Sequence, residues 1–253
     1  MAGARAFANG QSTSPQLEAM NAQLAALHES VFTLQATVDA LQKELAAVQS
    51  NNALALDHFV SVDTNPKIGV AGPNIIFRGV NIHIVSGSGA TDDGGNSRGL
   101  GNLIIGYDEE PSAVDPPNPA LKPGDRGGSH NLVIGAAHRF TQAAFGGLVA
   151  GRGNTISNTA ASVSGGFDST ASGEFASISG GGGNTASVRG ASISGGLANT
   201  ASGEVASVNG GFGNTASGEA ASISGGFENT ASGKFASVNG GSQNTASARA
   251  QEM

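Results

Sequence analysis

Two periodic patterns of apolar residues divide this chain into an N-terminal and a C-terminal part. Between residues 15 and 55, apolar positions lie alternately three and four residues apart, which is the heptad spacing of a coiled coil. In the last hundred residues the period is 15, and it does not slip. A strict short period predicts a solenoid in which each repeat forms one rung that stacks on the next. We therefore expect a mainly β protein, with a β-solenoid of 15-residue rungs preceded by an α-helical coiled coil.

The heptad pattern assigns ten residues to the coiled-coil core. They are Leu17, Leu24, Val31, Val38 and Leu45 at the a positions, and Met20, Leu27, Leu34, Leu41 and Val48 at the d positions. A weaker continuation runs through Asn52, Ala55, Phe59 and Val62, and Asn65-Pro66 closes it. Valine at a with leucine at d favours a dimer, whereas leucine at a leaves the oligomeric state open. A single amphipathic helix on a globular core is the alternative.

The 15-residue unit reads F-x-N-T-A-S-G-x-x-A-S-I-S-G-G and is clearest at Phe212–Gly226 and Phe227–Gly241. Its spacing predicts a column of core residues, one per rung: Val163, Ile178, Ile193, Val208, Ile223 and Val238. Other columns hold alanine, and a column of charged residues (Glu174, Arg189, Glu204, Glu219 and Lys234) is expected to face solvent. Pairs such as Gly180-Gly181 recur where the chain must turn tightly. One Ile or Val per rung makes a thin core, so we expect several copies to pack around an axis.

These patterns predict five segments. They are a flexible tail (1–14), a coiled-coil stalk (15–55), an irregular β-rich neck (56–128), a β-roll (129–250) and a short tail (251–253). Within the neck, β-prone runs occur at Lys67–Val70, Asn74–Arg78, Val80–Val85 and Leu103–Tyr107. Ser86–Arg98 and Pro111–Gly128 are expected to be loops, either functional or disordered. Recognition usually needs irregular exposed loops, so the candidate partner-binding residues are Asp115, Lys122, Asp125 and Arg126.

Composition narrows the function classes. The net charge of −7 provides no electrostatic attraction for nucleic acid or anionic lipid. There is no cysteine, hence no disulfide and no thiolate metal site. The start of the chain has no signal-peptide pattern, and no apolar run reaches 18 residues, so no transmembrane segment is expected.

Candidate chemical groups are few. The five histidines (His28, His58, His83, His130 and His138) lack metal-ligand spacing, and His138-Arg139 is expected in a loop. Asp92-Asp93-Gly94-Gly95-Asn96 has the residue types of a calcium loop but is expected to be a solvated turn. The carboxylates in Tyr107–Glu110 suit acid–base chemistry, yet adjacent acids in a loop are usually only solvated. We expect no enzymatic activity, no cofactor and no bound metal.

Two hydroxyl columns follow the repeat. Threonines recur from Thr155 to Thr245, and serines recur two residues later, from Ser157 to Ser247. Stacked about 4.8 Å apart, these T-x-S ladders would present a regular array that can match an ice lattice. Ladders that satisfy turns and neighbouring chains are the alternative interpretation.

The repeat resembles the YadA-like heads of trimeric autotransporter adhesins, whose repeat is close to N-S-V-A-I-G-x-x-S-x-A-x-G. Matching stretches are Ser162–Gly166, Ser177–Gly181, Asn102–Gly106 and Asn131–Gly135, followed by A-x-G at Ala171–Gly173, Ala201–Gly203, Ala216–Gly218 and Ala231–Gly233. The resemblance covers about residues 129–250. It implies a left-handed parallel β-roll, three chains around one axis, and adhesion at a surface.

Two features depart from that family. The stalk precedes the head, and the chain ends at Met253 without a membrane-barrel anchor. We therefore expect an extracellular, cell-surface or particle-borne homotrimeric fibre whose partner is a receptor, a glycan or a larger assembly. The alternatives are an ice-binding solenoid and, further off, a phage-like tail-fibre tip or glycan-processing spike.

Overall fold

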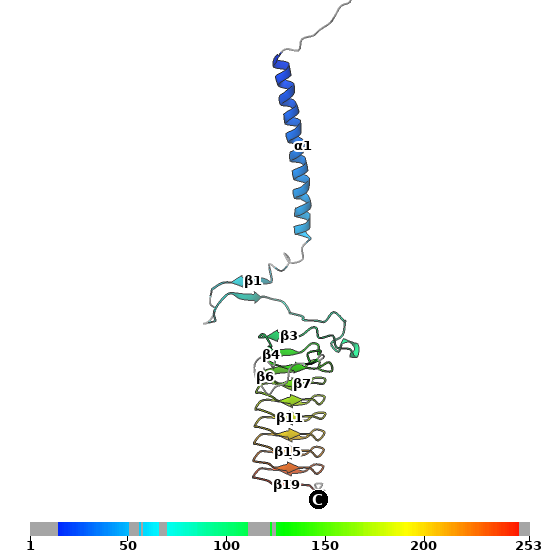
Figure 1. Cartoon of the computed structure of the whole chain (residues 1–253), viewed down its shortest axis with the longest axis vertical. Coiled ribbons are helices and arrows are strands. Elements are labelled where there is room, and N and C mark those ends of the chain that lie inside the picture. The colour runs from blue at the N-terminus through cyan, green and yellow to red at the C-terminus, as the bar shows by residue number, and fades with distance from the viewer. Residues whose placement is uncertain are drawn as a thin grey trace, which may run out of the picture. The chain divides into compact units, whose positions relative to one another are not determined.

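The computed structural model describes residues 15–50, 56, 58–65, 70–110, 122 and 125–247. The chain forms two compact units, Met1–Ile82 and His83–Met253 (Figure 1). The predicted tails and candidate residue Asp115 lie outside the described residues.

The first unit contains one long helix, α1, at Pro15–Gln49. Proline suits the first helical position, since its missing N–H would have no partner there, and Glu18 in the first turn complements the helix dipole. No residue of α1 is buried, and the ten predicted heptad residues are 40–65% exposed in the single chain. The continuation of the heptads to Val62 is wrong, because Val62 lies in a β-strand.

That strand belongs to a small antiparallel sheet. β1 (Val60–Asp63) pairs with β2 (Asn74–Phe77), and Val60 lies opposite Phe77. The predicted run at Asn74–Arg78 therefore forms a strand. The run at Val80–Val85 does not, because no neighbouring strand in the described chain supplies its backbone hydrogen bonds.

The second unit is a parallel β-solenoid, as the 15-residue period predicts (Figure 1). One nine-stranded sheet contains β3 (Leu103–Ile105), β4 (Leu132–Ala136), β6 (Leu148–Arg152), β8 (Ser162–Val163), β10 (Ser177–Ile178), β12 (Ser192–Ile193), β14 (Ser207–Val208), β16 (Ser222–Ile223) and β18 (Ser237–Val238). The eight-stranded sheet contains β5 (Arg139–Phe140), β7 (Thr155–Ile156), β9 (Thr170–Ala171), β11 (Thr185–Ala186), β13 (Thr200–Ala201), β15 (Thr215–Ala216), β17 (Thr230–Ala231) and β19 (Thr245–Ala246).

The strands of successive rungs pair in the same register. From β7 onward each strand residue pairs with the residue 15 positions further along, as Ile178 does with Ile193. A single line of bridges, including Phe212 with Phe227, runs along the third side of the rung. The parallel ladder begins at β3, which pairs with β4, so residues before the predicted start of the roll at 129 already belong to it.

Small apolar side chains fill the interior of the solenoid. The Ile/Val column from Val163 to Val238 is at most 6% exposed, and two alanine columns, represented by Ala171 and Ala176, are also buried. Each two-residue strand therefore directs one side chain inwards and one outwards. The sequence period places the same residue type at the same depth in every rung.

A buried asparagine ladder forms the polar part of this interior. Asn199 is fully buried, and its Nδ2 donates to the carbonyl oxygens of Gly195 (3.1 Å) and Gly211 (3.0 Å). Its Oδ1 accepts from the backbone N–H of Asn214 at 2.9 Å. The same bonds recur at Asn184, Asn214 and Asn229. The ladder thus satisfies the buried backbone groups at one corner of each rung.

Glycine is required at that corner. Gly181 has φ +86°, and an added Cβ would lie 2.0 Å from the carbonyl oxygen of Gly196. Neither the backbone conformation nor the space between rungs accepts a side chain. The backbone conformation and the close spacing of the rungs therefore require glycine at the second position of the predicted Gly-Gly turn.

Candidate functional site: the loop junction and the faces of the roll

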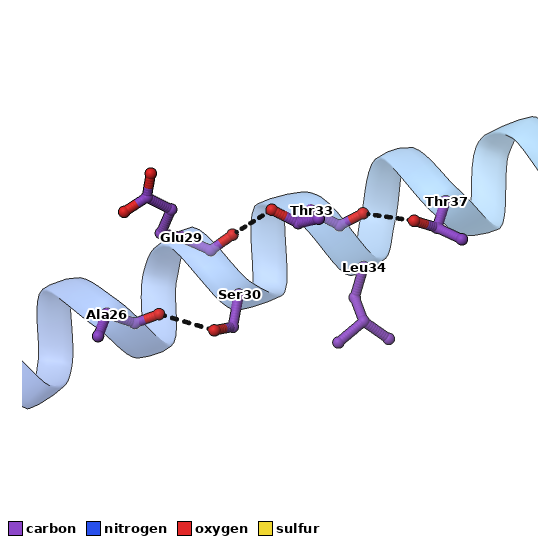
Figure 2. A pocket seen from close by; sticks show the side chains of 6 residues that line it. All are labelled: Ala26, Glu29, Ser30, Thr33, Leu34 and Thr37. Carbon is purple, nitrogen blue, oxygen red and sulfur yellow. Dashed lines mark hydrogen bonds between the residues drawn. The ribbon is translucent and has the colours of Figure 1, made fainter.

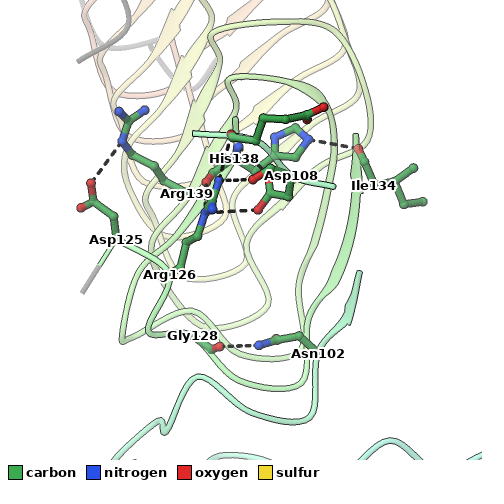
Figure 3. A network of polar contacts seen from close by, with 9 residues as sticks. Asn102, Asp108, Asp125, Arg126, Gly128, Ile134, His138 and Arg139 are labelled. Carbon is green, nitrogen blue, oxygen red and sulfur yellow. Dashed lines mark hydrogen bonds and ion pairs between the residues drawn. The ribbon is translucent and has the colours of Figure 1, made fainter. Parts of the chain in front are cut away.

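The neck loops are attached to the first rungs by a partly buried ion pair (Figure 3). Arg126 Nε lies 3.2 Å from Asp108 Oδ2, and the Asp108 side chain is only 5% exposed. Arg126 also donates to the backbone oxygens of Asp108 (2.6 Å) and His138 (3.2 Å). Asp108 is therefore not the solvated acid that its loop sequence suggests, because its carboxylate is paired with Arg126 against the roll.

A second ion pair holds the segment that contains Asp125 and Arg126. Arg139 Nε lies 3.3 Å from Asp125 Oδ2, and that carboxylate also accepts from the Lys122 backbone N–H at 2.8 Å (Figure 3). Arg139 belongs to β5, so the expectation that it lies in a loop is wrong, whereas His138 lies in the connection between β4 and β5 and is fully buried. His138 donates its backbone N–H to Asp108 Oδ1 at 2.9 Å, and its Nε2 lies 3.0 Å from the Ile134 carbonyl oxygen.

The predicted calcium-type sequence forms another internal cluster. Asp93, in the 3-10 helix Asp93–Gly95, is 7% exposed, and its carboxylate accepts hydrogen bonds from the Ser86 hydroxyl and the Arg98 backbone N–H. Hydrogen bonding from Ser129, Ser86 and Ser88 holds the pKa of Asp93 well below its usual range. The expectation that this carboxylate is solvated is wrong, because its hydrogen bonds join the two ends of the Ser86–Arg98 loop. Stability that arises from this lowered pKa is fully present above the pKa of Asp93 in the unfolded chain, and it is lost as the pH falls into strong acid.

These contacts within the chain determine which of the candidate partner-binding residues are free to contact a partner. The structure brings Lys122, Asp125 and Arg126 together with β5 and the segment that follows β3. The charged groups of Asp125 and Arg126 face partners within the chain, and Lys122 is exposed. Pairings between residues as distant as Asp108 and Arg126 depend on the return path of a loop, and no local sequence signal identifies them.

Hydroxyl side chains cover the outside of the eight-stranded sheet. Thr170 and Ser172 flank Ala171, which is fully buried, so the two hydroxyl side chains lie on the outer side of the strand. The strands stack in register, and the threonines therefore form one straight column along the roll. This face is a regular T-x-S array, as the repeat predicts.

Apolar side chains occupy a different, exposed column. Phe167, Leu197, Phe212 and Phe227 share one position of the rung and are 44–51% exposed. The rings of Phe212 and Phe227 stack with centroids 5.4 Å apart and an interplanar angle of 8°. The described residues leave about half of each of these side chains exposed.

The predicted outward column carries side chains of both charges. Arg189 lies 3.3 Å from Glu204 and 3.8 Å from Glu174, and Lys234 Nζ lies 2.7 Å from Glu219. All five side chains are at least 41% exposed. Such exposed pairs contribute on the order of 0–1 kcal/mol each.

One open groove lies along the described helix α1. Six residues of α1 line it, among them Ser30, Thr33 and Thr37, whose hydroxyls donate to backbone carbonyls one turn earlier at 2.9 Å (Figure 2). Because all its walls come from one helix, the groove cannot enclose a small molecule.

No group of three or more acidic, histidine or cysteine side chains in the described residues is placed to hold a metal ion. Within the same residues, no helix has both the length and the apolar character needed to cross a lipid bilayer.

Comparisons with protein-family models, with curated proteins and with solved structures found no match for this chain.

Proposed function

We propose that this protein is a non-enzymatic homotrimeric fibre that serves as an extracellular structural or attachment protein. In this proposal α1 forms the stalk as a coiled coil of three chains, and the solenoid forms a left-handed β-roll. The main support for this proposal is the exposure of the heptad residues of α1. All ten heptad residues are at least 40% exposed in the single chain, and no residue of the helix is buried. An isolated helix of this kind gains its stability from packing its apolar stripe against other helices.

The roll supports the same proposal independently. Its exposed column contains Phe167, Leu197, Phe212 and Phe227, with Gly182 between the first two, and monomeric soluble proteins rarely leave large apolar patches uncovered. Three chains that run in parallel around one axis would cover these side chains. The choice of three rather than two rests on the resemblance to YadA-like heads.

We assign attachment to the neck segment 111–121, presented three times around the axis. Threefold presentation raises avidity without strong single contacts. A Gly/Ser linker of equal length in place of 111–121 should leave assembly unchanged and weaken binding of the labelled full chain to a printed glycan array. The replacement must stop before Asp125, because Asp125 and Arg126 hold the first rungs. Equal binding by the variant would move the site to the roll.

Ice binding is the second candidate, because the T-x-S array lies on the outer face of one sheet. If this function holds, the full chain should show thermal hysteresis. Thr215→Lys should remove most of it, since a long charged side chain disrupts the array. Ser194→Lys, on the other sheet, is the matched control. A wild-type chain without hysteresis, or equal loss in both variants, would argue against this candidate.

A further inference from the structure

The β1–β2 sheet has one entirely apolar face. Because Val60 pairs with Phe77 and Val62 pairs with Ile75, these four side chains lie on the same side of the sheet. The set is called here the apolar hairpin face. Val62 is 67% exposed, Ile75 is 66% exposed and Phe77 is 50% exposed.

The opposite face is largely polar and internally bonded. Arg78 Nη1 donates to the Ser61 hydroxyl at 2.6 Å, and the Asp63 carboxylate accepts from the Asn65 backbone N–H at 3.0 Å. The Asn74 side chain donates to the Asn65 carbonyl oxygen at 3.1 Å. Alternation between an apolar and a polar side is typical of an antiparallel sheet that packs one face on a core.

The described residues of the first unit supply no such core. Among the described residues of the unit Met1–Ile82, none is buried. A two-stranded sheet alone is marginally stable in water and needs further strands or a packing surface. None of these described residues covers the apolar hairpin face, so a packing partner would stabilise the sheet.

A second copy of the chain fits this role best. The exposed heptad stripe ends at Val48 and α1 ends at Gln49, so only residues 50–59 separate the helix from β1. Eleven Cα–Cα steps span at most roughly 40 Å, so the sheets of bundled copies stay close together. This tether gives them a high effective concentration. The face carries no charged residue, so like-charge repulsion does not oppose contact between identical copies.

We propose that the apolar hairpin faces of neighbouring copies pack on one another and form an intermolecular β-layer directly after the stalk. This inference rests on the proposed assembly of α1. It gives the β1–β2 sheet a specific role, which is to hold the copies together between stalk and roll.

Cysteine cross-linking tests the inference cleanly, because the chain contains no cysteine. Three single variants of the full chain are oxidised with copper–phenanthroline and followed on non-reducing gels. Leu27→Cys reports the stalk, Val62→Cys reports the apolar hairpin face, and Ser61→Cys is the control on the opposite face. We expect linked pairs from Leu27→Cys and Val62→Cys, with Ser61→Cys at least about tenfold slower.

The outcomes separate the inference from the proposed function. If Leu27→Cys links and Val62→Cys is no faster than Ser61→Cys, the β-layer is rejected and the stalk is retained. If neither Leu27→Cys nor Val62→Cys links, both are rejected. As a further check, adding Ile75→Asp to Val62→Cys should abolish its link, and adding Ile75→Asp to Leu27→Cys should leave that link intact. An unchanged Val62→Cys rate would also overturn the inference.

Discussion

Replacing Ile193 by aspartate is expected to disrupt the roll. Ile193 is 1% exposed and lies between Ile178 and Val208 in adjacent rungs. The change removes a buried apolar side chain and places an unpaired carboxylate there, which should cost at least about 4 kcal/mol. Because rungs are stabilised mainly by their neighbours, we expect loss of pairing on both sides of the substitution. Thermal unfolding followed by circular dichroism should show a greatly lowered Tm.

The matched control is Glu204→Lys, in the next repeat and on the outside. Glu204 is about half exposed and pairs with Arg189. Its replacement loses this pair and adds a like charge, which should cost no more than about 1 kcal/mol. Equal shifts of Tm in the two variants would show that the assignment of inner and outer columns is wrong.

The asparagine ladder gives the second large effect. Asn199→Ala would remove the hydrogen-bond partner of the Gly195 carbonyl and of the Asn214 N–H, whereas the Gly211 carbonyl would keep the Leu197 N–H at 3.0 Å. Each unsatisfied group costs about 1–3 kcal/mol, so we expect a loss on the order of 3 kcal/mol in chemical denaturation.

Position 169 supplies a natural comparison. There, serine replaces asparagine, and its Oγ still accepts the Asn184 N–H at 3.2 Å. Asn199→Ser should therefore be milder than Asn199→Ala, and Ser169→Asn should stabilise the roll by about 1 kcal/mol. If all three variants unfold at the same denaturant concentration as the wild type, the ladder does not contribute to stability.

The repeat made the roll predictable, and the reason is physical. When rungs stack in register, a residue type that recurs every 15 positions must recur at one depth, so Ile193 and Glu204 can be assigned from spacing alone. The inward position of Asn199 is harder to predict. Asparagine is usually exposed, and only the geometry of the corner shows that its amide bonds three backbone groups.

The neck was less predictable for the opposite reason. Its sequence has no period, so contacts such as Asp108 with Arg126 depend on how the loop returns to the first rung. Asp93 and His138 likewise look like loop residues in sequence, and burial gives them partners that no local pattern indicates. The proposed assembly rests on the heptads of α1, which are a sequence signal, but a single chain does not contain the partners that would test it.

The number of chains per particle is the most direct measurement of the central claim. Sedimentation equilibrium of the full chain at micromolar concentration should give three times the chain mass of 24.8 kDa. A mass of one chain would contradict assembly through α1 and the roll, and a mass of two chains would contradict the threefold β-roll.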